Sequence, residues 1–383
     1  MTNVAPGDAR ALARTLVGVD SQNPSLVQGA AGERECAELL AGVLGEWGFR
    51  VEMHEALQGR PNVVARIGGG SGRSLLFNGH LDVVGVEGMT HAPFDGVERD
   101  DRLYGRGACD MKGGVAAMCA AAWLAARAGI GGEIIVTAVA DEEFRSAGTR
   151  ELLKRGVRAD AAIIAEPTAL AIMPAHRGFA WVEVVVEGRA AHGSRWEIGV
   201  DAIRHAGLLL AELDRVDAEL LPLRTHRLLG RGSLHASRIE GGIGMSTYPD
   251  QCTLAIERRT IPGERGVDAA SEVQRACDAV AARRPTFAAS VRLLFAQSPS
   301  DVPIDAPIVR ALGDALTARS EPVQLAGMSA WTDAALLNGA GIPAICFGPG
   351  DITLAHAAEE YIPLDEIDRA TTVLAELAQR WCR

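Results

Sequence analysis

Short apolar runs that favour β-strands alternate with helical stretches through the first 175 residues of the chain. Apolar strands separated by helices are typical of a sheet that is covered on both faces. We therefore expect an α/β fold with a layered sheet. The strand-like runs are 62–67, 74–79, 133–140 and 161–165, and the clearest helical stretches are 33–47 and 115–127.

The pattern changes near Pro174 and returns to the first style at 343–350. Residues 178–190 partly alternate apolar and charged side chains, which indicates a strand with one solvated face. Helical stretches at 200–216 and 269–282 and strand-like runs at 252–259 and 288–295 suggest a β-α-β-β-α-β order, the ferredoxin-like pattern. We expect a large domain over 1–175 and 297–383, with a small α+β domain, 176–296, inserted into it.

The net charge and the cysteine content limit the class of binding partner and the cellular compartment that we expect. The 383 residues carry a formal charge of −11, which disfavours nucleic acid as a partner. Seven cysteines without a C-x-x-C pair fit a reducing compartment. The N-terminus lacks the pattern of a secretory signal, and no run of about 18 apolar residues suggests a membrane span. We expect a cytoplasmic protein that is not bound to a membrane.

Acidic and histidine side chains follow four of the strand-like runs, and a further acid lies in a glycine-rich turn. Ligands bind at the carboxyl ends of the strands in open α/β sheets, so these segments can converge on one site. The side chains with this placement are His80, Asp82, Asp110, Glu142, Glu143, Glu166 and His356.

Two imidazoles and three carboxylates, His80, Asp110, Glu143, Glu166 and His356, form a ligand set without a thiolate. Such a set suits Zn²⁺, with Co²⁺ or Mn²⁺ as alternatives. Five ligands suit two ions that share one carboxylate, and Asp110, alone in its tight turn, is the natural bridge.

Two further carboxylates are expected to assist these ligands. Asp82 lies two residues after His80 and could accept a hydrogen bond from its free ring nitrogen. Glu142 and Glu143 are adjacent, so in extended geometry one can face the ions while the other does not. Glu142 could then take a proton from metal-bound water, a role that needs a carboxylate near but not on the ions.

The strings GHLDVV, LYGRGACDMKGGVAAM, ADEE, AEPT, AAHGS and ERRTIPGE, with a late FGPG and AH, run in one order along the chain. In these motifs the sequence resembles the M20 metallopeptidases and deacylases, most closely the acetylornithine deacetylase and succinyl-diaminopimelate desuccinylase branch. The resemblance implies a phosphorylase/hydrolase-like catalytic domain, built on a mixed sheet covered by helices, with an inserted ferredoxin-like lid and dimerisation domain.

The resemblance also assigns roles to individual residues. It implies that His80, Asp110 and Glu166 hold one ion and that Asp110, Glu143 and His356 hold the other. It implies Glu142 as general base, Asp82 as supporting carboxylate and a cis peptide after Asp110. His192 matches a small-domain histidine that stabilises the oxyanion, often in the partner subunit. Arg259 matches an arginine that receives a substrate carboxylate.

We expect a dinuclear metallohydrolase, homodimeric in the manner of that family, that cleaves the amide bond of a small N-acyl amino acid. Three alternatives stay open. The chain could be a dipeptidase or carboxypeptidase of the same family, a hydrolase of a non-peptide amide, or a non-catalytic binding protein that kept the fold.

Overall fold

The computed structural model describes residues 4–383, and the chain divides into two compact units. The large unit runs to Pro174 and resumes over Val302–Ala326 and Thr332–Arg383. The small unit consists of Ala175–Asp301 and Gly327–Trp331. The small unit is therefore formed by one long segment and one short later segment, both inserted into the sequence of the large unit.

The main sheet is mixed, as the resemblance implied, with the strand order β1-β2-β6-β3-β7-β17-β8-β15 and β16 beside β8. Strands β6, β3, β7 and β17 are parallel neighbours, whereas β1 and β2 pair antiparallel at one end. The strands are β1 (Arg50–Leu57), β2 (Arg60–Gly68), β3 (Ser74–His80), β6 (Glu133–Val139), β7 (Ala161–Ile164), β8 (Ile172–His176), β15 (Ser300–Asp301), β16 (Leu325–Met328) and β17 (Ala344–Cys346).

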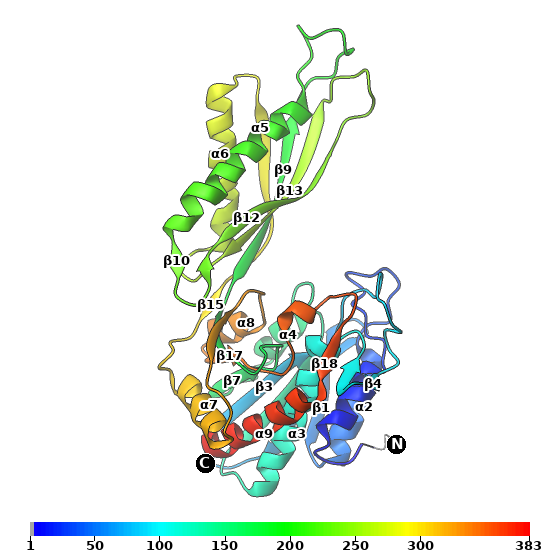
Figure 1. The fold of residues 1–383 in the computed structure, drawn as a ribbon, viewed down its shortest axis with the longest axis vertical. Helices are drawn as coiled ribbons and strands as arrows, with labels where there is room; N and C mark the ends of the chain where they lie inside the picture. Colours follow the sequence, from blue (N-terminus) through cyan, green and yellow to red (C-terminus); the bar gives the residue numbers. More distant parts are fainter. Residues whose placement is uncertain (1–3) are drawn as a thin grey trace. The chain divides into compact units, whose positions relative to one another are not determined.

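Both faces of the parallel strands are buried. Leu75 and Phe77 pack into an apolar cluster with helices α1, α2, α3, α7 and α9. Leu76, between them, points to the opposite face and is equally buried. Figure 1 shows α3 and α9 side by side over the sheet. The helices of this unit are α1 (Ala9–Val17), α2 (Arg34–Glu46), α3 (Gly113–Ala128), α4 (Ala147–Lys154), α7 (Pro307–Ala318), α8 (Ala334–Gly339) and α9 (Leu364–Trp381).

Short elements complete the large unit around the ends of the parallel strands. A three-stranded sheet has the order β18-β5-β4. Within residues 4–383, no helix combines the length and the apolar character needed to cross a bilayer. The short elements are β4 (Val97–Arg99), β5 (Arg102–Tyr104), β18 (Tyr361–Pro363), η1 (Ala108–Lys112) and η5 (Ile352–Leu354).

The small unit has a four-stranded antiparallel sheet with the order β12-β13-β9-β14. Val182, Val184 and Val186 on β9 alternate into a core shared with helices α5 and α6. Its main elements follow the β-α-β-β-α-β order: β9 (Gly178–Glu187), α5 (Ala202–Arg215), β12 (Ser233–Gly241), β13 (Gln251–Thr260), α6 (Ala269–Arg283) and β14 (Ala288–Gln297). Its short elements are η2 (Val216–Leu220), η3 (Leu221–Leu223), β10 (Thr225–His226), β11 (Gly230–Arg231) and η4 (Gly266–Asp268).

Candidate metal centre

The four parallel strands β6, β3, β7 and β17 deliver acidic and histidine side chains to one edge of the main sheet. His80 ends β3, Glu142 and Glu143 follow β6, and Glu166 follows β7. His356 lies in the segment after β17. Neighbouring parallel strands end on the same side, so side chains far apart in the sequence meet there.

The first group of possible metal ligands is buried and consists of His80, Asp110 and Glu166. One ligand atom from each lies within 4.8 Å of the others. The ring nitrogen Nε2 of His80 is 3.0 Å from Oδ1 of Asp110. Such a set of one imidazole and two carboxylates could hold a divalent cation.

The second group consists of Asp110, Glu143 and His356, again with ligand atoms within 4.8 Å of one another. Nε2 of His356 is 3.5 Å from Oδ2 of Asp110 and 3.1 Å from the carboxylate of Glu143. Asp110 thus uses one oxygen toward each histidine and is common to both groups. The Asp110–Met111 peptide is cis, as the resemblance implied.

Burial and crowding shift the carboxyl groups of this site. Burial raises the pKa of Glu142 and of Glu166 well above the ordinary value, and neighbouring acidic charges add to the effect. Burial and the charge of Asp110 also raise the pKa of Glu143. A nearby cation would stabilise the ionised form of each of these carboxyl groups and lower its pKa.

The pKa values of the two histidines are also raised, but here the cause is the surrounding carboxylates. Burial opposes protonation of His80, yet its hydrogen bond to Asp110 and the surrounding acids hold its pKa well above its ordinary value. Hydrogen bonds to Asp110 and Glu143 raise the pKa of His356 to about 10. Burial would raise the pKa of Asp110, but its hydrogen bonds with His356 and His80 lower it overall. The surrounding acids therefore favour the protonated, positively charged form of both imidazoles.

Asp82 contacts this group differently from the expectation. Nδ1 of His80 lies 2.8 Å from the main-chain oxygen of Asp82 and 3.7 Å from its carboxylate. The main-chain oxygen is therefore the hydrogen-bond acceptor for His80. The Asp82 carboxylate instead accepts the N–H groups of Glu142 and Glu143, each at 3.1 Å. It holds the turn that follows β6.

His192 and Arg259 belong to the small unit, whereas the five possible ligands belong to the large unit. His192 is exposed, and its Nδ1 lies 2.8 Å from the hydroxyl oxygen of Ser194. Arg259, on β13, pairs with Glu257 at 3.0 Å and lies 5.4 Å from the centre of the Phe179 ring.

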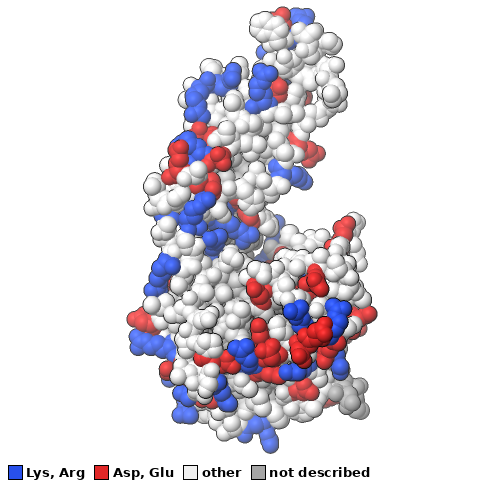
Figure 2. Space-filling model, viewed as in Figure 1, with Lys and Arg blue, Asp and Glu red and all other residues white. Residues whose placement is uncertain are grey.

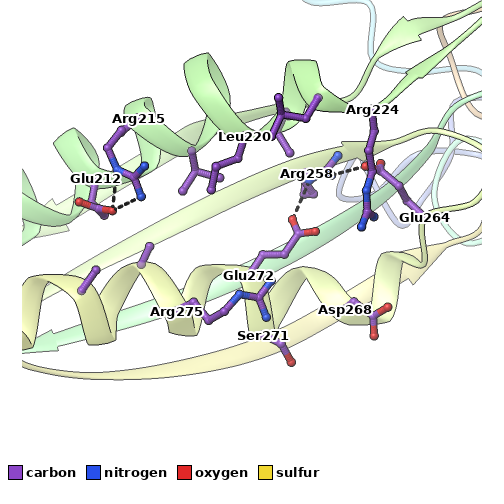
Figure 3. A pocket seen from close by; sticks show the side chains of 15 residues that line it. Glu212, Arg215, Leu220, Arg224, Arg258, Glu264, Asp268, Ser271, Glu272 and Arg275 are labelled. Carbon is purple, nitrogen blue, oxygen red and sulfur yellow. Dashed lines mark hydrogen bonds and ion pairs between the residues drawn. The ribbon is translucent and has the colours of Figure 1, made fainter.

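The neighbouring residues Arg258 and Arg259 have different surroundings. Arg258 lines a groove of about 650 Å³ in the small unit. Figure 3 shows Arg258 in this groove, joined to Glu264 and Glu272. Both ion pairs measure 2.9 Å, and the Arg258 side chain is only 1% exposed. Arg258 is therefore committed to the fold, while the Arg259 side chain remains 31% exposed.

The sequence reasoning missed several buried polar residues that surround the site. Asn23 donates to Asp82 at 2.8 Å, and Glu360 accepts the N–H of Asp110 at 3.1 Å. Asp333 is buried, which raises its pKa to about 6. No local sequence signal pointed to Glu360, because its buried partner Arg106 lies 254 positions away along the chain.

Known proteins share both the fold and the sequence motifs of this chain. A family model described as peptidase family M20/M25/M40 matches residues 76–380. An acetylornithine deacetylase of Myxococcus xanthus is 31% identical over 348 residues, which cover 88% of this chain and 89% of that protein. The chain therefore belongs to peptidase family M20/M25/M40 and is an M20-type hydrolase, which confirms the resemblance seen in the motifs.

Two further proteins extend the comparison. The N-formyl-4-amino-5-aminomethyl-2-methylpyrimidine deformylase of Bacillus subtilis is 29% identical over 405 residues, covering 97% of this chain and 94% of that protein. The crystal structure of a dinuclear metal-binding M20 peptidase from Bacillus subtilis has a TM-score of 0.74 and 19% identity. The alignment covers 98% of this chain and 97% of that structure. This structural likeness extends the shared fold over nearly the whole chain.

Proposed function

We propose that this protein is a dinuclear metallohydrolase that cleaves the amide bond of a small N-acyl amino acid, in the manner of an acetylornithine deacetylase. The carrying observation is the pair of ligand groups that share Asp110 at the edge of four parallel strands. The similarity to an acetylornithine deacetylase over most of both chains supports this substrate class.

The residues present fit two divalent cations. The donors are imidazole nitrogens and carboxylate oxygens, a set that favours Zn²⁺ and also suits Co²⁺ or Mn²⁺. His80, Asp110 and Glu166 would hold one ion, and Asp110, Glu143 and His356 the other. Four carboxyl groups, counting Glu142, crowd around two imidazoles. Burial and neighbouring acidic charges raise the pKa values of Glu142, Glu143 and Glu166, and cations would offset both effects.

When bound, the two ions would act as Lewis acids toward the substrate carbonyl and the attacking water. Glu142 takes a proton from that water and returns it to the leaving amine. Asp82 fixes the main chain of Glu142 during both transfers. In this proposal His192 donates to the oxyanion and Arg259 binds the α-carboxylate of the substrate.

The small unit is proposed to serve as a lid and as the contact surface of a homodimer. Strand β12 is an edge strand whose residues from His235 to Gly241 are exposed. The loops before α5 and after β12 lie at one end of this unit (Figure 1), and that end is largely uncharged in Figure 2. Exposed Trp196, Ile243 and Met245 lie in these loops. A twin edge strand would cover such a surface.

A reducing compartment, and hence a cytoplasmic location, is proposed from the cysteines. All seven are free and buried, and they make no disulfide within residues 4–383. Buried free thiols of this kind fit an environment that keeps cysteines reduced.

A substrate panel tests the proposed reaction. Purified protein loaded in turn with Zn²⁺, Co²⁺ or Mn²⁺ is offered N-acetyl, N-succinyl and N-formyl amino acids, dipeptides and an N-formyl aminopyrimidine. The proposal expects the highest kcat/KM on an N-acyl amino acid. A higher kcat/KM on a dipeptide would indicate a dipeptidase instead. Hydrolysis of the N-formyl aminopyrimidine alone would favour a deformylase, the second candidate function, which the Bacillus subtilis relative suggests. Absence of hydrolysis with metal bound would favour a binding protein.

A further inference from the structure

Two buried arginine–glutamate pairs lie behind the metal-facing side chains of the large unit. Arg60 pairs with Glu33, and their side chains are 8% and 0% exposed. Arg106 pairs with Glu360 at 2.6 Å, with side chains 3% and 1% exposed. A buried ion pair contributes little net stability, because desolvation offsets the attraction between the charges. Their contacts with the main chain suggest a more specific role.

The pair formed by Arg60 and Glu33 holds the residue that immediately precedes Glu142. Glu33 accepts the N–H of Asp141 at 3.1 Å, and Arg60 lies 3.0 Å from the Asp141 carboxylate. Asp141 has a φ of +67°, a left-handed conformation that is uncommon outside glycine. Its main-chain oxygen accepts N–H groups of the following turn, including that of Arg145 at 3.2 Å. The pair therefore fixes where this turn begins.

A second route joins the same pair to the same turn. The Asp141 carboxylate accepts a hydrogen bond from Asn23 at 3.3 Å, and Asn23 also donates to Asp82 at 2.8 Å. Asp82 in turn accepts the N–H groups of Glu142 and Glu143. The main chain of Glu142 is thus held from the preceding residue and through its own amide.

The pair formed by Arg106 and Glu360 holds a different part of the site. Glu360 accepts the N–H groups of Cys109 and Asp110 at 3.0 and 3.1 Å. Arg106 also donates to the main-chain oxygen of Ala357, the residue after His356, at 3.4 Å. This pair therefore touches the main chain of the shared carboxylate and the segment of the second histidine, but it makes no contact with the Glu142 turn in these hydrogen bonds.

We infer that the two pairs are separate positioning devices: Arg60 with Glu33 sets the general-base turn, and Arg106 with Glu360 sets Asp110 and His356 for metal binding. This inference rests on the proposed function. A shift of about 1 Å at a reacting group can cost on the order of a hundredfold in rate. Residues behind metal ligands typically alter affinity by roughly 10–100-fold. The first pair should therefore control kcat, and the second should control metal affinity.

Arginine-to-lysine variants test this separation, because lysine keeps the charge but cannot supply the several fixed N–H donors of a guanidinium. Arg60 contacts Glu33 through two nitrogens, and Arg106 donates to Gly85, Ala357 and Glu360. The variants are Arg60→Lys and Arg106→Lys. The control is Arg369→Lys, on α9, which alters a two-pronged contact with Glu321. Metal affinity is measured on metal-free protein by competition with a chelator, and kcat and KM are measured at saturating metal.

For Arg60→Lys we expect kcat to fall by about 10–100-fold, with KM and metal affinity within about threefold of wild type. For Arg106→Lys we expect metal affinity to fall by about 10–100-fold, with kcat largely restored at saturating metal. The control should change neither quantity. Equal losses of metal affinity in both variants, or wild-type kcat in folded Arg60→Lys, would overturn the inference.

Two safeguards keep the test decisive. If Arg60→Lys fails to fold, Glu33→Gln replaces it, because the amide keeps an oxygen for the Asp141 N–H; failure of both to fold would mean that the pair serves only the fold. Metal affinity is read without any substrate, so a protein that binds two ions but hydrolyses nothing would contradict the proposed reaction while leaving the Arg106 result intact.

Discussion

The small unit and the metal-binding edge of the large unit both bury charged side chains, but they neutralise them differently. In the small unit, Arg258 is enclosed by Glu264 and Glu272, and Glu212 accepts hydrogen bonds from Arg215 and Arg283. At the edge of the main sheet, carboxyl groups instead gather around two imidazoles, and burial raises the pKa values of three of them. Paired charge supports the fold of the small unit, whereas crowded like charge in the large unit marks a site that would bind cations.

Glu142→Gln gives the largest effect expected from this comparison. Removing the proton acceptor should lower kcat by about 10²–10⁴-fold, while the ligand groups and their metal content stay unchanged. The measurement is hydrolysis of the best panel substrate together with metal analysis of the same sample. Glu38→Gln, on the exposed face of α2, is the matched control. Normal hydrolysis by Glu142→Gln would remove this residue from its role.

Much of this arrangement follows from local sequence pattern. Apolar runs followed by acids or histidine placed His80, Glu142, Glu143 and Glu166 at strand ends, because buried parallel strands are continuous in their apolar character. Strand β12 escaped prediction because it is an exposed edge strand with little apolar alternation. The hydrogen-bond acceptor for His80 was also misassigned, since the main-chain oxygen of Asp82 competes with its side chain.

The supporting ion pairs could not be predicted from local pattern. Arg106 and Glu360 lie 254 positions apart, and only the folded sheet brings them together. A periodicity identifies which face of a strand is buried, but it does not identify the distant partner of a buried charge. The roles of His192 and Arg259 stay predictions from the resemblance.

Arg258→Met tests the small-unit side of the comparison. It would leave Glu264 and Glu272 without their buried partner, which should lower the free energy of unfolding by about 3–5 kcal/mol. Urea denaturation measures the change. Metal affinity of the protein that remains folded should equal that of wild type, because the site lies in the other unit. An unchanged urea midpoint would show that the paired charges do not support this unit.

His176, in the small unit, gives a smaller and pH-dependent effect. Burial lowers the pKa of His176 from 6.5 to about 4, so the unfolded chain takes up the proton first as the pH falls. The contribution of the neutral His176 ring to the free energy of unfolding is fully present above about pH 6.5. It is lost as the pH falls toward 4, with a change of about 3 kcal/mol at most.

Replacing the imidazole should remove this pH dependence. His176→Phe is therefore expected to flatten the free energy of unfolding between pH 6.5 and 4 relative to wild type. Urea denaturation across that range provides the measurement, with His235→Phe, at an exposed position, as the control. Equal pH dependence in wild type and His176→Phe would show that this buried ring does not set the acid sensitivity.

Anomalous diffraction from crystals of the protein grown with Zn²⁺ would show whether the dinuclear site forms. We expect two ions about 3.5–4 Å apart. One should be bound by His80, Asp110 and Glu166, and the other by Asp110, Glu143 and His356. A single ion, or zinc bound elsewhere with these five side chains left free, would rule out a dinuclear centre at this edge of the sheet.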